Sequence, residues 1–253
     1  MRVVAVHEDV LVGTSAIWQT NCCLIHAGDE AFLVDSPLLP EELEALPGVA
    51  EHVGWPVSGL LATHADWDHL LGRLAFPGAA LGCAETSAAR LAAEPGAAAR
   101  SLRAFDDQQY LDRPAPLSLG QVQALPVPGT LELGEHEIEL HPADGHTKDG
   151  MALLAPWAGV LACGDYLSEV EIPTFFEAGG SLSAYRATLE RLRPLVERAE
   201  HVVPGHGPVL GRERALEILD EDLRYLDDLF PPAGRSGETQ MRNHERNLEA
   251  LES

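Results

Sequence analysis

The segment Thr63–His69, which reads THADWDH, gathers four side chains that can bind a metal ion or move a proton. These side chains are His64, Asp66, Asp68 and His69. Imidazole and carboxylate groups are borderline-to-hard ligands that suit zinc, iron or manganese, and a site built from them needs no cysteine. The segment therefore predicts metal chemistry, in which Asp68 could also orient a nucleophile or transfer a proton.

Three later segments place the same kinds of side chain beside glycine. They are Asp144-Gly145-His146, Cys163-Gly164-Asp165 and Pro204-Gly205-His206-Gly207. Each follows an apolar run that we expect to be a strand, and the ends of strands are places where a rigid scaffold presents ligands. A single Gly-His turn or His-x-Asp pair is usually structural. The ordered occurrence of all four segments is what predicts a metal site.

The elements that must position these side chains alternate between short strands and helices. Apolar runs predict strands over residues 3–6, 10–13, 22–26, 31–35, 57–63, 79–83, 121–125, 131–133, 137–141, 151–155, 159–163 and 201–203. Helical spacing predicts helices over residues 40–46, 69–76, 86–93, 181–199, 212–229 and 238–251, and residues 97–116 are expected to be irregular. Such interleaving predicts a layered α/β architecture in a single domain, residues 1–253, with C-terminal helices from about residue 211.

The ordered set of residues resembles the metallo-β-lactamase-fold hydrolase superfamily. The family pattern is His-x-His-x-Asp-His, followed by a Gly-His, a bridging Asp and a last His. The match runs from about residue 21 to residue 207, and the resemblance implies a four-layer αββα sandwich with two divalent metal ions at one edge of its sheets. It also implies the ligands: His64 and His146 for the first ion, Asp68, His69 and His206 for the second, and Asp165 as the bridge.

One position departs from the family pattern, because Asp66 occupies the place of the second histidine. The flavodiiron proteins have a glutamate there, so Asp66 could bind the first metal, or it could only hold a water by hydrogen bonding. With histidine, two dications, two carboxylates and a hydroxide sum to about +1, and with Asp66 the sum is about zero. A third carboxylate should make the ions weaker Lewis acids. We expect zinc first, with iron or manganese as alternatives.

The resemblance implies a dinuclear metallohydrolase. A hydroxide that bridges the two ions would attack a small ester, thioester or lactone. A second hypothesis is an iron-dependent oxidoreductase of the same fold, acting on dioxygen, nitric oxide or a persulfide. A third is a non-catalytic metal-binding module that keeps the ligands for structure.

The composition of the chain limits the classes of partner that we expect. The chain has 40 acidic against 17 basic residues, for a formal charge of −23, and such a field repels polyphosphates, so nucleic acid is not an expected partner. No apolar stretch is long enough for a membrane span, and no signal peptide is recognisable. The four cysteines are few and irregularly spaced, which favours reduced thiols and a cytoplasmic protein. Because there is no basic groove for nucleic acid, we expect a small-molecule substrate. The amphipathic C-terminal helices could support a homodimer.

Several further residues have competing interpretations. Asp35 is expected to support a turn near the site, whereas Asp144 could hold a ligand ring or simply form a turn. Cys163 is expected to be a core thiol and His244 a surface residue. The segment 166–180 could wall a substrate pocket or could contribute its aromatic side chains to the core.

Overall fold

The first of two sheets is built from the N-terminal half of the chain. The computed structural model describes residues 1–252, and within them this sheet has seven strands in sequence order. Strands β1 to β4 pair antiparallel, whereas β4 to β7 pair parallel. The strands are β1 (Arg2–His7), β2 (Val10–Thr14), β3 (Asn21–Ala27), β4 (Glu30–Asp35), β5 (Val57–Ala62), β6 (Ala80–Ala84) and β7 (Val122–Leu125).

The second sheet is built from the C-terminal half. Its order over the same described residues is β13-β12-β11-β10-β9-β8, and only β11 and β12 pair parallel. The strands are β8 (Gly129–Leu133), β9 (His136–Pro142), β10 (Met151–Ala155), β11 (Val160–Ala162), β12 (His201–Val203) and β13 (Leu210–Gly211).

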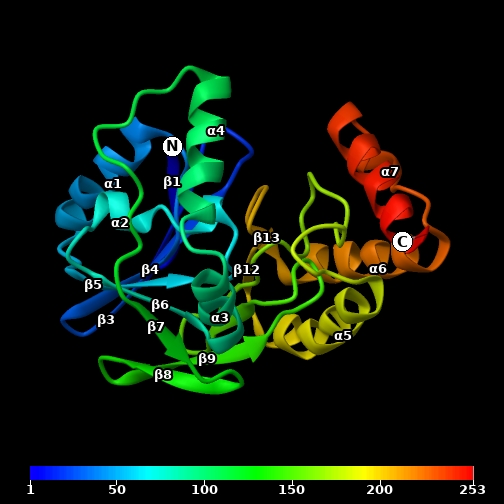
Figure 1. Cartoon of the computed structure of the whole chain (residues 1–253). Coiled ribbons are helices and arrows are strands. Elements are labelled where there is room, and N and C mark those ends of the chain that lie inside the picture. The colour runs from blue at the N-terminus through cyan, green and yellow to red at the C-terminus, as the bar shows by residue number, and fades with distance from the viewer. Residues whose placement is uncertain (253) are drawn as a thin grey trace.

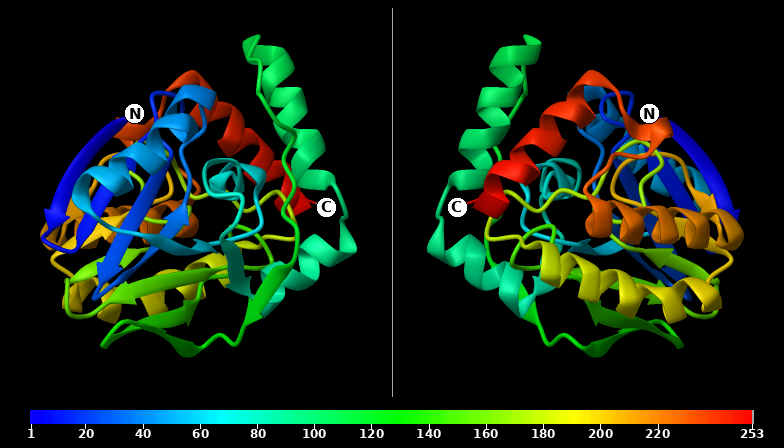
Figure 2. Two further views of the ribbon diagram at one scale, coloured as in Figure 1. Left: turned by 90° about the vertical axis from the view of Figure 1, so that its left-hand side faces the viewer. Right: turned by 90° about the vertical axis from the view of Figure 1, so that its right-hand side faces the viewer.

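Helices lie on the outer side of each sheet. Figure 1 shows α1 (Pro40–Val53), α2 (Gly72–Ala75) and α4 (Ala97–Gln109) on one side of the strands, and α5 (Leu182–Arg198), α6 (Arg212–Asp228) and α7 (Glu238–Glu252) on the other. The remaining α-helix in the described part is α3 (Glu85–Ala93), and in Figure 2 α5 and α6 lie side by side. No helix within residues 1–252 has both the length and the apolar composition that a membrane crossing requires.

The apolar core is divided in the way that a layered fold requires. One buried cluster joins Ile25 and Leu61 of the first sheet to Ile138 and Leu153 of the second, so it fills the space between the sheets. A second cluster packs α5 and α6 against the second sheet, a third lies between the first sheet and its helices, and a fourth joins α1, α2 and α4 to one another. This arrangement confirms the expected four-layer αββα sandwich.

Two of the expected elements were wrong. Residues 97–116, expected to be irregular, contain α4, because Ala98, Leu102 and Phe105 recur at helical spacing and pack into an apolar cluster. The helix expected over residues 69–76 is broken into a 3₁₀ turn at Trp67–His69 and the short α2. The turn curls the chain directly after β5, and it is this curl that brings Asp68 and His69 back toward the sheet edge.

Candidate metal centre

The loops that follow four strands meet at one edge of the two sheets. His64, Asp66, Asp68 and His69 come directly after β5 of the first sheet. The second sheet supplies His146 after β9, Asp165 after β11 and His206 after β12. All seven side chains singled out in the sequence therefore lie together, and they form overlapping groups that could hold a metal ion.

One half of the site is made by His64, Asp66 and His146. Asp66 Oδ2 lies 3.5 Å from the Nε2 atoms of both His64 and His146. His146 Nε2 is also 3.3 Å from Asp165 Oδ2. The sequence left open whether Asp66 faces the centre, and the structure directs one of its oxygens between the two imidazoles.

The other half is made by Asp68, His69 and His206. His206 Nε2 lies 3.4 Å from Asp68 Oδ2 and 3.5 Å from Asp165 Oδ2. His69 Nε2 lies 3.2 Å from Asp165 Oδ1. The Asp165 carboxylate thus stands between the two halves, within reach of donor atoms in both.

These distances fit a metal better than they fit hydrogen bonds. Two ligand atoms bound about 2.1 Å from one tetrahedral ion are about 3.4 Å apart, close to the separations found here. Among the described residues, His64 Nε2, His69 Nε2 and Asp165 Oδ1 are buried atoms without a hydrogen-bond partner. Buried polar atoms are rarely left unpaired. The donor set therefore fits one or two metal ions.

The opposite nitrogen of each histidine ring is held by the protein. His64 Nδ1 is 3.1 Å from Thr63 Oγ1, and His146 Nδ1 is 2.9 Å from both the carbonyl and the hydroxyl oxygen of Thr174. His206 Nδ1 is 3.2 Å from Thr20 Oγ1. Such partners fix the ring and its tautomer, which leaves Nε2 to face the centre.

Asp35 has the supporting role that the sequence predicted. Its Oδ2 lies 3.0 Å from His69 Nδ1 and accepts a 2.8 Å hydrogen bond from Thr63 Oγ1, while its Oδ1 accepts a 2.8 Å bond from Thr63 N. Asp35 adopts φ +55° at the end of β4. One carboxylate thus orients a candidate ligand and fixes the start of the loop that carries His64.

The charges at the centre favour cations. Burial alone would raise the pKa of Asp66, but the bonds and charges of His146 and His64 outweigh it and hold the pKa well below its ordinary value. Burial lowers the pKa of His146, and its contacts with Asp66 and Asp165 more than compensate, raising the pKa to about 9. Without metal the His146 imidazole therefore keeps a proton that an ion would displace.

A cavity of about 470 Å³ opens onto the centre. Its apolar wall includes Trp18, Trp67 and Phe176, and Trp67 packs edge-on against Trp18 with ring centroids 5.7 Å apart. Glu94 and Glu177 also line it. The cavity lies between the two helical layers, since α3 and α4 supply one side and α7 the other.

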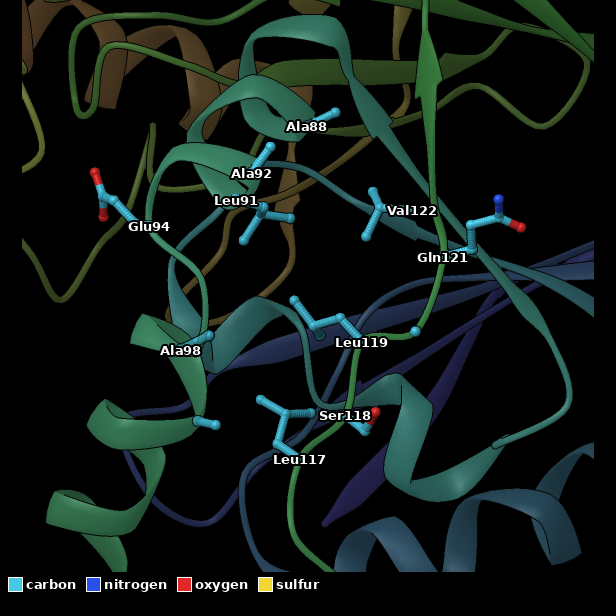
Figure 3. Close-up of a pocket in the computed structure, with 13 residues that line it drawn as sticks. Ala88, Leu91, Ala92, Glu94, Ala98, Leu117, Ser118, Leu119, Gln121 and Val122 are labelled. Atoms are coloured by element: carbon cyan, nitrogen blue, oxygen red, sulfur yellow. The ribbon is translucent and has the colours of Figure 1, made fainter.

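A second cavity, of about 490 Å³, lies beside the first, between α3, α4 and the segment before β7. Figure 3 shows Leu91, Leu117 and Leu119 gathered around it. Leu91, Glu94 and Ala98 line both cavities. Glu94 is the only ionisable side chain lining the second cavity in the described structure, so the reactive groups belong to the first.

Two charged residues of the site, Arg90 and Asp149, are new relative to the sequence analysis, and a third, Glu171, lies in the segment 166–180 but was not singled out there. Arg90 Nη2 donates a 2.6 Å bond to Asp66 Oδ1, and Arg90 Nη1 donates a 3.0 Å bond to Asp149 Oδ1. Glu171 places a carboxylate oxygen within 4.8 Å of ligand atoms of Asp165 and His206. Asp149 follows the Gly-His turn by three residues and Glu171 lies in the segment 166–180, but nothing near Arg90 in the chain marks it as a site residue.

The remaining predicted residues are placed as follows. Asp144 pairs with Arg191 and holds no ligand ring, whereas Cys163 is a buried thiol as expected. His244 is half-buried, with Nδ1 3.1 Å from the hydroxyl of Tyr225. The segment 166–180 is divided between the two alternatives, since Ile172 and Phe175 enter the core and Glu171, Thr174, Phe176 and Glu177 line the cavity, whose use by a substrate stays a prediction.

Comparisons with known proteins agree with this fold. The family model described as the metallo-beta-lactamase superfamily matches residues 16–206. A metallo-beta-lactamase family protein from Thermus thermophilus shares 22% identity, with a TM-score of 0.72 over 98% of this chain and 93% of that one. A metallo-beta-lactamase from Pontibacter korlensis shares 18%, with a TM-score of 0.61 over 90% and 99%. One from Hirschia baltica shares 17%, with a TM-score of 0.57 over 87% and 96%.

Proposed function

The chain belongs to the metallo-beta-lactamase superfamily, and we propose that it is a metal-dependent hydrolase of a small ester, thioester or lactone. The observation that carries the proposal is the convergence of seven donor side chains, among which two Nε2 atoms and an oxygen of the central carboxylate lack other partners. Unpaired donors of this kind are what a metal-dependent enzyme presents to its ions.

The proposed ligands follow the two halves of the site. His64, Asp66 and His146 would hold one divalent ion, Asp68, His69 and His206 the other, and Asp165 would lie between them. Zinc is the first expectation, because imidazole and carboxylate suit it. When bound, two such ions would supply Lewis-acid stabilisation of developing negative charge and an activated water.

Asp68 is the proposed proton carrier. Burial raises the pKa of this carboxyl, but the charges of His69 and His206 outweigh it, so the group is ionised at neutral pH. Its backbone carbonyl accepts a 3.3 Å bond from Ser36 Oγ, which fixes the turn that carries it. A carboxylate held at the cavity floor can orient a nucleophile and then return the proton to a leaving group.

The cavity supports an uncharged substrate over an anionic one. Arg90 is the only basic residue, apart from the candidate histidine ligands, among the described cavity-lining residues, and its guanidinium is already paired with Asp66 and Asp149. Glu94, Glu171 and Glu177 also line the walls, Glu177 is paired with Arg246, and burial raises the pKa of Glu171. An apolar acyl group would pack against Trp18 and Phe176, whereas a carboxylate or phosphate would find no free cation among these lining residues.

The test begins with elemental mass spectrometry of protein purified without added metal and without a nickel column. We expect about two zinc ions per chain, followed by turnover in a panel of esters, thioesters and lactones with uncharged acyl groups. Asp68→Asn should lower kcat by about 10²-fold or more, the scale of a lost proton-transfer group. Fully loaded protein that turns over no member of the panel would refute the hydrolase.

Iron-dependent redox chemistry is the second candidate, and the oxygen-rich donor set favours it. Asp66 and Glu171 add carboxylates beyond Asp68 and Asp165, and oxygen donors suit harder ions such as iron or manganese. Protein that purifies with iron and consumes oxygen or a persulfide would place this reaction first.

A further inference from the structure

Arg90 links the candidate metal centre to a helix that supplies none of the proposed ligands. The residue lies in α3, and its side chain is only 11% exposed. One nitrogen reaches Asp66 Oδ1 at 2.6 Å and another reaches Asp149 Oδ1 at 3.0 Å. Asp149 is fully buried, and its Oδ2 accepts a 2.9 Å bond from Ala65 N. The guanidinium thus joins the loop after β5, the loop after β9 and α3.

These bonds decide which way the Asp66 carboxylate faces. Its Oδ1 is occupied by Arg90, so Oδ2 is the atom that lies 3.5 Å from the Nε2 atoms of His64 and His146. A carboxylate turns easily about its terminal torsion unless something holds it. We propose that Arg90 is a positioning residue that fixes Asp66, so that Oδ2 is presented to the first metal ion beside His64 and His146.

Arg90 also offsets part of the negative charge beside the first half of the site. Asp66 and Asp149 each carry −1 and Arg90 carries +1, so the three together contribute about −1. Two dications, Asp68, Asp165 and a hydroxide sum to about +1, and this cluster brings the total to about zero. The inference rests on the proposed metal centre, and it predicts that the effect of replacing Arg90 depends on whether Asp66 is present.

The experiment measures zinc affinity, by competition with a chromogenic chelator, in four proteins. These are the wild type, Arg90→Gln, Asp66→His and the double variant Asp66→His/Arg90→Gln. Arg90→Gln alone should weaken zinc binding at the first site about tenfold, the usual effect of losing a group that orients a ligand. In the Asp66→His background the same change should strengthen binding, because Arg90 then has no carboxylate ligand to orient and its positive charge only repels the ion.

A purely structural role for Arg90 gives a different pattern. Zinc affinity would then fall by the same factor in both backgrounds, or change in neither, and either result would overturn the proposal. Arg90→Lys keeps the charge but cannot bridge both carboxylates with a planar fork, so it should weaken binding as Arg90→Gln does. Wild-type affinity in Arg90→Lys would refute the role in orientation.

Control variants separate effects on folding from effects on zinc binding. Arg113→Gln is the matched control, because Arg113 is a similarly buried arginine that pairs with Asp106 and carries no proposed ligand, and it should bind zinc as the wild type does. Loss of Arg90 leaves the buried carboxylate of Asp149 without a cation as partner. All four proteins are therefore also compared in a background that carries Asp149→Asn. Zinc binding is read without substrate, so a failed hydrolase assay would leave this inference standing.

Discussion

Gly205 stands where the Asp165 carboxylate and the His69 imidazole leave no room for a side chain. A Cβ at this position would overlap Asp165 Oδ1 and lie 3.0 Å from His69 Cε1. Gly205 N also donates a 2.6 Å bond to Gly164 O, so the backbone cannot move away from Asp165 without loss of this bond. Gly205→Ala should therefore displace the central carboxylate and weaken zinc binding at least about tenfold.

The measurement is zinc content and affinity, with circular dichroism to show that the protein is folded. Gly211→Ala is the matched control, because a Cβ at Gly211 meets no atom within 4 Å and the residue does not need a left-handed backbone. We expect wild-type zinc binding in Gly211→Ala. Wild-type binding in Gly205→Ala as well would show that Asp165 is not needed where the structure puts it.

His146 makes metal affinity depend on pH. Its pKa in the absence of metal is raised to about 9, whereas Asp66 stays ionised because its pKa lies well below the ordinary value. Below about pH 9 an ion must displace the proton on His146, so zinc affinity should rise between about pH 6 and pH 9, by up to about tenfold per pH unit for each proton released. Chelator competition at several pH values, corrected for protonation of the chelator, measures this slope. The slope should be shallower in His146→Ala, and a flat profile in the wild type would contradict the prediction.

At the scale of residues, the side chains that could be predicted are those that stand in a recognisable local motif. His64, Asp66, Asp68 and His69 could be found because they lie within one short segment, and a Gly-His turn marks His146. The partner of Asp66 could not be found in this way, because Arg90 lies 24 positions away on a helix that carries no motif. Only the packing of α3 against the loop after β5 brings the two charges together.

At the scale of elements, α7 holds the loop that orients His146. Asn247 of α7 is fully buried, its side-chain oxygen accepts a 3.0 Å bond from Phe175 N, and its nitrogen donates a 2.7 Å bond to Pro173 O. Thr174, whose two oxygens meet His146 Nδ1, lies between them in the chain. The last helix thereby reaches the metal centre through two contacts.

Asn247→Ala should show this connection. The change leaves a buried N–H and a buried carbonyl without partners, which should cost about 2–3 kcal/mol of unfolding free energy in urea. Because Thr174 is then held less firmly, zinc affinity should fall several-fold as well. Arg242→Ala, on the exposed face of the same helix, should change neither quantity. A loss of stability with unchanged zinc affinity would show that α7 does not act on His146.

Helices α4 and α5 show what sequence periodicity can predict. The region of α4 was expected to be irregular, whereas α5 was predicted as a helix. In α4 the apolar stripe is narrow, because arginine, serine and alanine separate Ala98, Leu102 and Phe105 and two aspartates and two glutamines follow them, so the segment resembles a polar loop. In α5 the Ser181 side chain accepts a bond from Ala184 N, and six buried residues form a broad stripe. Sequence patterns reveal wide stripes and capped ends, but narrow stripes are identified only by the partner they pack on, here Trp18 and Trp67.

At the scale of the whole molecule, the proposed ligands come from both sheets. The first sheet supplies His64 and Asp68, for example, and the second supplies His146 and Asp165. Without an ion, the carboxylates of the two sheets are stabilised only by contacts with imidazoles, such as that of Asp66 with His146. Metal binding should therefore replace these contacts with stronger bonds and join the two sheets through one centre.

The consequence is a stability that depends on metal concentration. An ion that binds only the folded chain adds about 2.7 kcal/mol when its concentration is about 100 times its Kd. For a protein of this size that gain raises the melting temperature by roughly 5–10 °C. We therefore expect chelator-treated protein to unfold at lower temperature and zinc to restore the loss, with a melting midpoint that continues to rise as free zinc increases.

The Asp165→Asn variant should have a melting midpoint nearer to that of the chelated wild type and should lose most of the response to zinc, because it lacks the carboxylate shared by both halves of the site. A midpoint that is independent of zinc in the wild type would mean that the convergent side chains hold no ion, and calorimetry across a series of zinc concentrations distinguishes the two results.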